Sequence, residues 1–163
     1  MRYVIRRIHW RGELRFLNEK GEFSYLFKER LVSFTSDLLN AAGEKILVIR
    51  KLPLQMRPKF EVLRDNDVVA TITSERDTRE WYRVQIGGKT GLSIRPNYWR
   101  TRFDFVNSEG RLAVLNKPII PLFWPVDLTV FDERQEEIAV AVTVAVLEAE
   151  RTDALDDQLR RSW

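Results

Sequence analysis

The chain has 163 residues, of which 44% are hydrophobic and 31% charged, and this composition is typical of a folded globular domain. It contains no cysteine, which excludes disulfides, thiol nucleophiles, cysteine zinc sites and iron–sulfur clusters. The one histidine, His9, gives a histidine metal site or a Ser-His-Asp triad little to build on, so we interpret it as structural. We therefore expect no metal and no other cofactor.

The charge is distributed unevenly along the chain. Residues 1–131 hold 23 Lys and Arg against 15 Asp and Glu, a balance of +8, whereas residues 132–163 hold 4 against 9, a balance of −5. A basic body favours an anionic partner, but it equally favours contact between the body and the acidic C-terminal segment. Both interpretations stay open from the sequence.

No targeting or membrane-spanning segment is predicted. Charges interrupt the N-terminal sequence Met-Arg-Tyr-Val-Ile-Arg-Arg before an apolar signal region can form. The longest uncharged run, Ile138 to Leu147, has ten residues, about half the length that a spanning helix needs. We expect a cytoplasmic protein that meets a membrane only as a peripheral protein.

Turn signals recur about every 22 residues along the chain. Between them lie short alternating runs rich in β-branched and aromatic residues, such as residues 101–106 and 111–115. Each repeat is therefore predicted to be a β-hairpin, and together they predict ten to twelve antiparallel strands that close into a barrel or split into a sandwich. The turns fall at Gly21, Gly43, Asn66, Gly87–Gly88, Gly110 and Asp132–Glu133.

The last part of the chain breaks this pattern. Residues 136–151 contain no Gly or Pro, begin with two glutamates and end with Arg151, which suits a helix and its dipole. Alternating Val and Ala is also typical of a buried strand, so the pattern leaves both open and favours the helix. A helix that is apolar on every side must be enclosed.

These features together predict a mainly β fold. We expect one domain over residues 1–151, a closed antiparallel barrel of about twelve strands built from hairpin repeats around a buried helix near 136–151. A polar tail, short and amphipathic or frayed, follows over residues 152–163. The alternative is a plain β-sandwich whose last element is a strand.

This plan resembles the tubby C-terminal-like fold and most closely its LURP-one-related branch, including the small bacterial single domains. The likeness is carried by residues 1–5, by Arg50–Leu54 running into Pro58–Val62, and by Glu137–Leu147. The resemblance implies a twelve-stranded barrel around a hydrophobic helix, shared with phospholipid scramblases, and a link to membranes, since tubby-like domains bind phosphoinositide headgroups through basic side chains. The chain lacks the cysteine-rich segment and the spanning helix of scramblases, so scramblase activity is not implied.

Two short motifs are interpreted as hairpin turns. Gly87 to Gly91 looks like the end of a phosphate-binding loop, but Arg83 stands where that motif requires a glycine. Asp65 to Asp67 begins like a calcium loop and then continues with apolar residues where further oxygen ligands are needed. No nucleophile motif or paired catalytic set is visible, so an enzyme is the least favoured class.

Basic residues carry the strongest functional signal. Two predicted inter-hairpin loops combine cations with apolar or aromatic residues, a pattern suited to the surface of an anionic bilayer. The alternative without a binding function is an arginine-rich barrel surface with Arg–Glu pairs between neighbouring strands. The predicted lipid-binding residues are Arg50, Lys51, Arg57, Lys59, Arg95, Arg100 and Arg102.

The leading hypothesis is therefore a non-enzymatic binding module that docks on anionic phospholipid or phosphoinositide headgroups. The alternative is a protein-interaction or scaffold domain that uses exposed aromatic loops, with Tyr98, Trp99, Phe123 and Trp124 as partner-binding residues. Nucleic acid comes third, because the isoelectric point near 9.3 permits it but no recognition motif is present.

Overall fold

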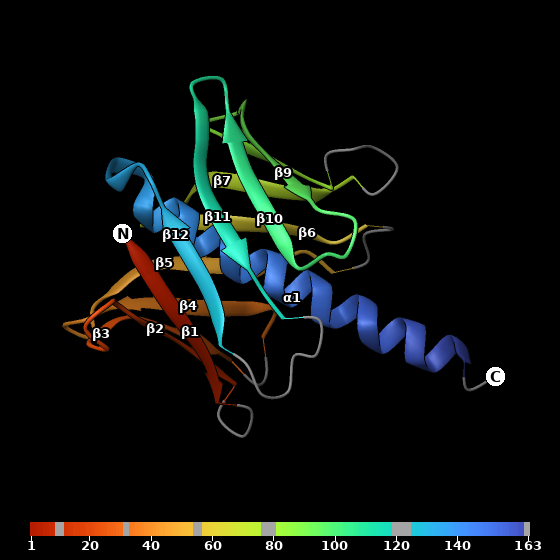
Figure 1. Ribbon diagram of the computed structural model, residues 1–163, viewed down its shortest axis with the longest axis horizontal. Coiled ribbons are helices and arrows are strands. Elements are labelled where there is room, and N and C mark those ends of the chain that lie inside the picture. The colour runs from red at the N-terminus through yellow and green to blue at the C-terminus, as the bar shows by residue number, and fades with distance from the viewer. Residues whose placement is uncertain (9–11, 31–32, 54–56, 76–80, 119–124, 162–163) are drawn as a thin grey trace.

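The computed structural model describes residues 1–8, 12–30, 33–53, 57–75, 81–118 and 125–161, and in the last range it describes side chains only up to Thr152. In this part of the chain, twelve antiparallel strands form a closed barrel, and β1 (Arg2–Ile8) completes the ring against β12 (Val126–Val130). The barrel encloses a long helix, α1 (Glu136–Arg161), which follows a 3₁₀ turn, η2 (Glu133–Gln135) (Figure 1). The predicted barrel and central helix are confirmed, and the sandwich alternative is wrong.

Each strand pairs with its neighbours in the chain, so the barrel is a series of consecutive hairpins. The other strands are β2 (Glu13–Leu17), β3 (Phe23–Glu29), β4 (Thr35–Asn40), β5 (Lys45–Lys51), β6 (Lys59–Arg64), β7 (Asp67–Ser74), β8 (Tyr82–Ile86), β9 (Lys89–Pro96), β10 (Arg102–Asn107) and β11 (Gly110–Asn116).

Three hairpin turns begin with an asparagine and carry a glycine three residues later. The Oδ1 atom of Asn18 accepts hydrogen bonds from the backbone amides of Lys20 and Glu22, at 3.0 and 2.9 Å. Asn40 and Asn107 likewise each accept two amide hydrogens from their own turn. An asparagine that bonds its own turn in this way replaces ladder hydrogen bonds that the backbone loses where the chain reverses.

The hairpin repeat also carries a repeated irregularity. In the β2–β3, β4–β5, β6–β7, β8–β9 and β10–β11 pairs, the register shifts by one residue close to the turn. A bulge of this kind bends a strand and increases its twist, which is what a sheet needs in order to close on itself. The 22-residue spacing is therefore a repeat of bulged hairpins, which the turn signals alone did not reveal.

The two ambiguous motifs are hairpin turns, as predicted. Gly87 and Gly88 have φ angles of +56° and +79° and connect β8 to β9. Asp65 and Asn66, with φ angles of +51° and +72°, connect β6 to β7. Two consecutive residues in the left-handed region are what a two-residue hairpin turn requires, and Gly, Asn and Asp tolerate that conformation best.

The helix fills the space that the barrel encloses. Twelve strands surround a lumen too wide for their own side chains to fill. Every side chain from Ala139 to Val146 is fully buried, and inward-facing aromatic side chains such as Phe16, Phe103 and Phe105 surround them. The one polar residue of this run, Thr143, donates its hydroxyl to the carbonyl of Ala139 at 2.8 Å. The small Val and Ala side chains let the barrel approach the helix from all sides.

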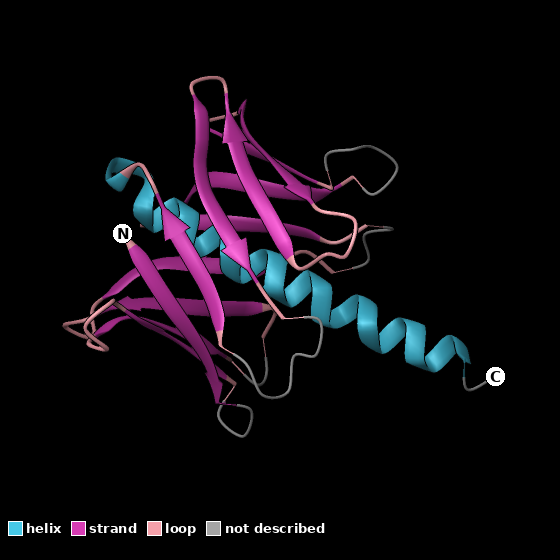
Figure 2. Cartoon of the chain, viewed as in Figure 1, coloured by secondary structure: helices cyan, strands magenta, loops and turns pink. Residues whose placement is uncertain are grey.

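The end of the helix differs from the prediction. α1 continues to Arg161, past the predicted helix end near residue 151, so residues 152–161 are helical and the frayed form of the predicted tail is wrong. This last part projects beyond the strands (Figure 2). No helix in the described residues is both long enough and apolar enough to cross a membrane.

Candidate binding surface at the helix-exit end

Antiparallel connectivity places the two predicted basic loops at the same end of the barrel. Strands with odd numbers all finish where α1 leaves the barrel, which we call the exit end. The tight turns and the beginning of α1 lie at the opposite end, the start end. Residues 52–58 after β5 and residues 97–101 after β9 therefore connect strands at the exit end. Leu54 to Met56 lie outside the described residues.

Glu150 of α1 joins the helix to the barrel at the exit end. Its carboxylate accepts hydrogen bonds from the Tyr82 hydroxyl at 3.0 Å, from Arg100 at 3.0 Å and from the Lys117 ammonium at 2.9 Å. Its side chain is only 9% exposed. The Arg100 guanidinium also lies over the ring of Trp81, 4.2 Å from its centroid. Arg100 is thus part of the packing between loop and helix.

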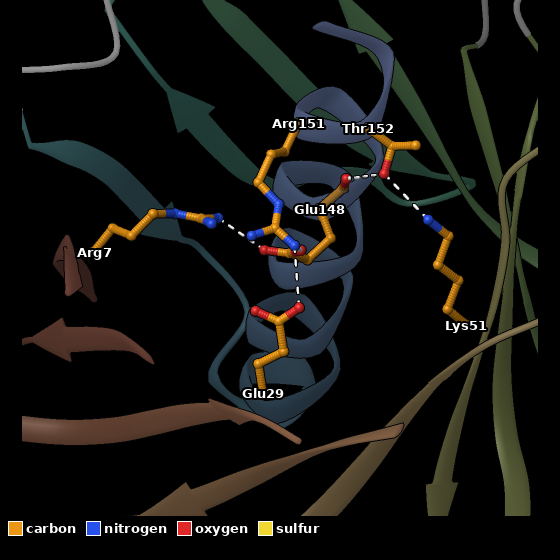
Figure 3. A network of polar contacts seen from close by, with 6 residues as sticks. All are labelled: Arg7, Glu29, Lys51, Glu148, Arg151 and Thr152. Atoms are coloured by element: carbon orange, nitrogen blue, oxygen red, sulfur yellow. Dashed lines mark hydrogen bonds and ion pairs between the residues drawn. The ribbon is translucent and has the colours of Figure 1, made fainter. Parts of the chain in front are cut away.

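Glu148 forms a second junction on another side of the helix. Its carboxylate accepts from Arg7 and from Arg151, both at 2.8 Å, and Arg151 also reaches Glu29 of β3 at 3.1 Å (Figure 3). One turn further along the helix, the hydroxyl of Thr152 donates to the backbone carbonyl of Glu148 at 3.0 Å. Both junctions fix the radial position of α1 in the mouth of the barrel.

Lys51 differs from the other predicted cations because it lies in the barrel mouth. It follows Leu47 and Ile49 at alternating positions of β5, the two residues whose side chains are buried inside the barrel. Its ammonium donates to Thr152 Oγ1 at 3.1 Å (Figure 3). Among the side chains that the structure describes, which on α1 end at Thr152, no carboxylate lies within ion-pair distance of Lys51, so a neutral hydroxyl is its partner there.

The remaining predicted cations lie on the outer face or the rim of the barrel. Arg50 donates to Glu61, which is directly opposite in the β5–β6 register, through its Nε atom at 2.9 Å. Arg102 donates to Asp104 at 3.1 Å, and Arg111 reaches the same carboxylate at 3.1 Å. Arg50–Glu61 is an Arg–Glu pair between neighbouring strands, as the alternative interpretation predicts, whereas Arg102 and Asp104 lie on the same strand. The other three cations are Arg57 and Arg95, which are exposed, and Lys59, which is half-buried.

Two aromatic side chains of the β9–β10 connection are exposed at the exit end. Tyr98 is 90% exposed and Trp99 is 70% exposed, and their rings meet edge to face with centroids 5.2 Å apart. The other two predicted partner-binding residues, Phe123 and Trp124, lie outside the described residues, as does His9. Tyr98 and Trp99 are the predicted aromatic residues that the structure places.

A cavity of about 350 Å³ opens between α1 and the ends of β3, β4 and β5; we call it the exit cleft. Its wall is apolar where it meets the barrel core and charged where it meets the helix. The apolar lining comprises Phe27, Phe34, Ile49 and Phe60, and the polar lining comprises Glu29, Arg30, Ser33, Ser36, Lys51, Glu148, Arg151 and Thr152. No metal-binding group of three or more acidic or histidine side chains occurs in the described parts of the chain.

At the start end, a different set of hydrogen bonds holds the helix. The hydroxyls of Tyr3 and Tyr25 both donate to the same oxygen of Glu136, each at 2.5 Å, and Arg64 pairs with Glu137. Burial, and then the hydrogen bond to Glu136 and its negative charge, raise the pKa of both tyrosines above the ordinary value of 10. Glu136 therefore stabilises the helix both as a carboxylate near the positive dipole end and as an acceptor for the barrel.

These tyrosines make the stability depend on alkaline pH. In the unfolded chain they lose their protons near pH 10, whereas in the folded chain they keep them. Their contribution is complete below pH 10 and is lost as the pH rises above that value, because the unfolded state then binds fewer protons. We expect the melting temperature to fall more steeply above pH 10 than in a Tyr3→Phe, Tyr25→Phe variant. Equal slopes would contradict this linkage.

The sequence did not point to Glu148 and Glu150 as binding partners of the barrel, although it carried a signal. Two glutamates at the end of a predicted helix oppose the helix dipole, which favours cations there. Such a position needs compensating cations from elsewhere in the fold. The structure supplies Arg7, Arg100 and Lys117, so the basic body and the acidic segment do contact each other.

Comparison with known proteins agrees with this architecture. The protein-family model described as LURP-one-related matches residues 1–147. Among solved structures, a protein from Arabidopsis thaliana is similar to this chain with a TM-score of 0.65 and 13% sequence identity, over 90% of this chain and 88% of that one. At this identity the likeness shows the fold alone. No curated protein matches the chain.

Proposed function

Because the chain belongs to the LURP-one-related family, whose model spans nearly all of the barrel and the buried part of α1, we propose that it is a non-enzymatic binding module that docks on anionic phospholipid through the exit end. The observation that carries this proposal is the exposed Tyr98–Trp99 pair, which lies between Arg95 and Arg100 in the sequence, in the connection that follows β9 at the exit end. Amphipathic aromatic rings partition into the headgroup zone of a bilayer, while neighbouring cations contact phosphates.

The docking cations are not equivalent. Arg57, Lys59 and Arg95 flank the two loops, and we call them the docking set. Arg50 and Arg102 are partly exposed and can join the docking set by leaving their carboxylate partners. An exposed ion pair contributes at most about 1 kcal/mol, so exchanging its carboxylate for a lipid phosphate costs little. Arg100, stacked on Trp81 and bound to Glu150, positions the β9–β10 loop instead.

The shape of the exit end suggests one direction of approach to a bilayer. Because α1 projects beyond the strands at this end (Figure 1), the membrane would meet the outer side of the β5–β6 and β9–β10 connections. The Tyr98 and Trp99 rings would then enter the interface, and the docking set would lie at the level of the phosphates. Each cation near an anionic surface contributes about 1 kcal/mol, so binding is expected to be weak and sensitive to salt.

Co-sedimentation with vesicles tests this proposal. We expect the protein to bind phosphatidylcholine vesicles that contain phosphoinositide and not to bind pure phosphatidylcholine vesicles. The bound protein is expected to dissociate from the vesicles as the salt concentration is raised. Changing Arg57, Lys59 and Arg95 to Gln is expected to weaken binding roughly 100-fold, since about 3 kcal/mol of attraction is lost. Changing Tyr98 and Trp99 to Ser is expected to weaken binding further without changing the salt dependence.

A matched control exists at the start end. Lys20, Lys45 and Lys89 are exposed beside the tight turns, and changing all three to Gln removes the same net charge. This variant is expected to bind vesicles almost as well as the natural chain. Equal losses in both triple variants would show that only the overall charge matters, and unchanged binding in the exit-end variant would refute the docking surface.

The second candidate function is protein interaction through the same aromatic pair. Exposed Tyr and Trp side chains are typical of the energetically dominant residues of protein interfaces. This function predicts that a stoichiometric protein partner is lost on Trp99→Ala and that neither vesicle composition nor salt affects the complex strongly. Absence of vesicle binding at low salt would favour this second function over the first.

A further inference from the structure

The exit cleft combines an apolar floor with a charged mouth. Phe27, Ile49 and Phe60 are each at most 4% exposed and form the floor, where the cleft reaches the barrel core. Phe34, another lining residue, is 63% exposed. A volume near 350 Å³ falls in the range of small-molecule sites, which are mostly apolar with a few placed polar groups.

Among the side chains that the structure describes, every charged group that lines the cleft has an oppositely charged partner except Lys51. Arg151 binds Glu29 and Glu148, and Arg30 forms a two-pronged pair with Asp37 at 2.7 and 2.9 Å. Lys51 has only the Thr152 hydroxyl as its partner in the described parts of the chain. A half-buried ammonium without a counter-charge is a ready partner for an anion, because a charge-assisted hydrogen bond is stronger than one to a neutral hydroxyl.

One class of ligand satisfies both halves of the cleft. A nucleotide or sugar would place polar groups against the floor, where three buried apolar side chains offer no hydrogen-bond partner. A cationic ligand would face the charge of Lys51. An apolar chain with a single anionic head would bury its chain against the floor and present its head to the ammonium.

We infer that the exit cleft binds a single-chain anionic amphiphile, namely the carboxylate of a fatty acid, with Lys51 as the residue that holds the head group. The chain of the ligand lies against Phe27, Ile49 and Phe60. This site is separate from the proposed docking surface, because Lys51 lies in the barrel mouth whereas Arg57, Lys59 and Arg95 flank the loops. It therefore does not depend on vesicle binding.

Calorimetric titration with laurate, below the concentration at which it aggregates, tests the inference. Lauryl alcohol has the same chain and no charge, and it is expected to bind at least tenfold more weakly. Lys51→Gln keeps a donor for Thr152 but removes the charge, and it is expected to weaken laurate roughly tenfold and to leave the alcohol unchanged. Ser36→Phe fills part of the cleft and is expected to abolish binding of both ligands.

Lys45→Gln is the matched control, because Lys45 is an exposed lysine on the same strand at the start end. Laurate affinity is expected to be unchanged in this variant. The inference is overturned if the natural protein does not bind laurate, if Lys51→Gln binds it as tightly, or if a folded Ser36→Phe variant binds it unchanged. Should Ser36→Phe fail to fold, the comparison of Lys51→Gln with Lys45→Gln decides alone.

Discussion

Glu150→Ala is expected to lower the free energy of unfolding by about 3 kcal/mol, because it leaves two cations at the barrel mouth without their shared counter-charge. Arg100 and Lys117 both donate to this carboxylate, and the Tyr82 hydroxyl loses the same acceptor. For a chain of this size such a loss corresponds to a melting temperature about 10 °C lower. Thermal denaturation followed by circular dichroism measures it.

Two further variants separate the charge from other effects. Glu150→Gln keeps the shape of the side chain and one acceptor oxygen, so its cost is expected to be smaller, about 1 to 2 kcal/mol. Glu109→Gln removes an equal charge from an exposed turn at the start end and is expected to cost less than about 0.5 kcal/mol. A Glu150→Ala variant as stable as Glu109→Gln would show that the junction does not stabilise the fold.

The expected cost reflects how the helix is held in the barrel. Apolar packing around α1 has no direction, since Val and Ala side chains can slide or rotate against the inner wall at modest cost. Hydrogen bonds to Glu136 at one end and to Glu148 and Glu150 at the other fix both the depth and the rotation of the helix. The same contacts place Lys51 beside Thr152 and so shape the exit cleft.

The strands were predictable because their determinants are local. An asparagine or glycine that accepts positive φ marks each tight turn, and alternation of apolar residues between the turns indicates a half-buried strand. Closure of the ring was predictable in outline, since many strands need to bury their edges. The five bulges were not, because a register shift such as that between Phe16 and Leu17 depends on how two strands fit and leaves no residue signature.

The helix was harder to derive from the sequence. Its centre satisfies the patterns of both a buried strand and a buried helix. Only the length of the run without Gly or Pro and the charges at its two ends favoured the helix. Its last ten residues were assigned to a tail because they are mostly polar, yet a helix that is anchored inside a barrel can continue beyond the strands. Tertiary anchoring therefore decided where α1 ends.

The two basic loops were predictable as connections between hairpins, but the environment of each cation in them was not. The structure places both connections at one end of the barrel. Whether a cation on a strand faces outward or into the mouth depends on strand register, so Arg50 and its neighbour Lys51 have opposite environments although they are adjacent in the sequence. The carboxylate partner of Arg100, Glu150, lies 50 residues away in the chain and beyond any local pattern.

Thr143→Asp is expected to abolish folding, whereas Thr143→Val at the same position is expected to change stability by less than about 1 kcal/mol. Thr143 is fully buried, and its neighbours on both sides of α1 are equally buried, so the new carboxylate can reach neither water nor a cation. Burying an unpaired charge costs more than about 5 kcal/mol, which is comparable with the whole stability of a domain.

Valine has nearly the shape of threonine and needs no hydrogen-bond partner. The Thr143 hydroxyl donates to the carbonyl of Ala139, an acceptor that the helix already uses, so removing this hydrogen bond leaves no buried group without a partner. The contrast between the two substitutions tests enclosure itself, because a helix with one solvent-facing side would accept Asp at some of its positions. Ala141, Val142 and Thr143 together point to different sides of α1. A helix sealed inside the barrel would be contradicted if an Asp variant at any of these three positions gave soluble protein that melts cooperatively.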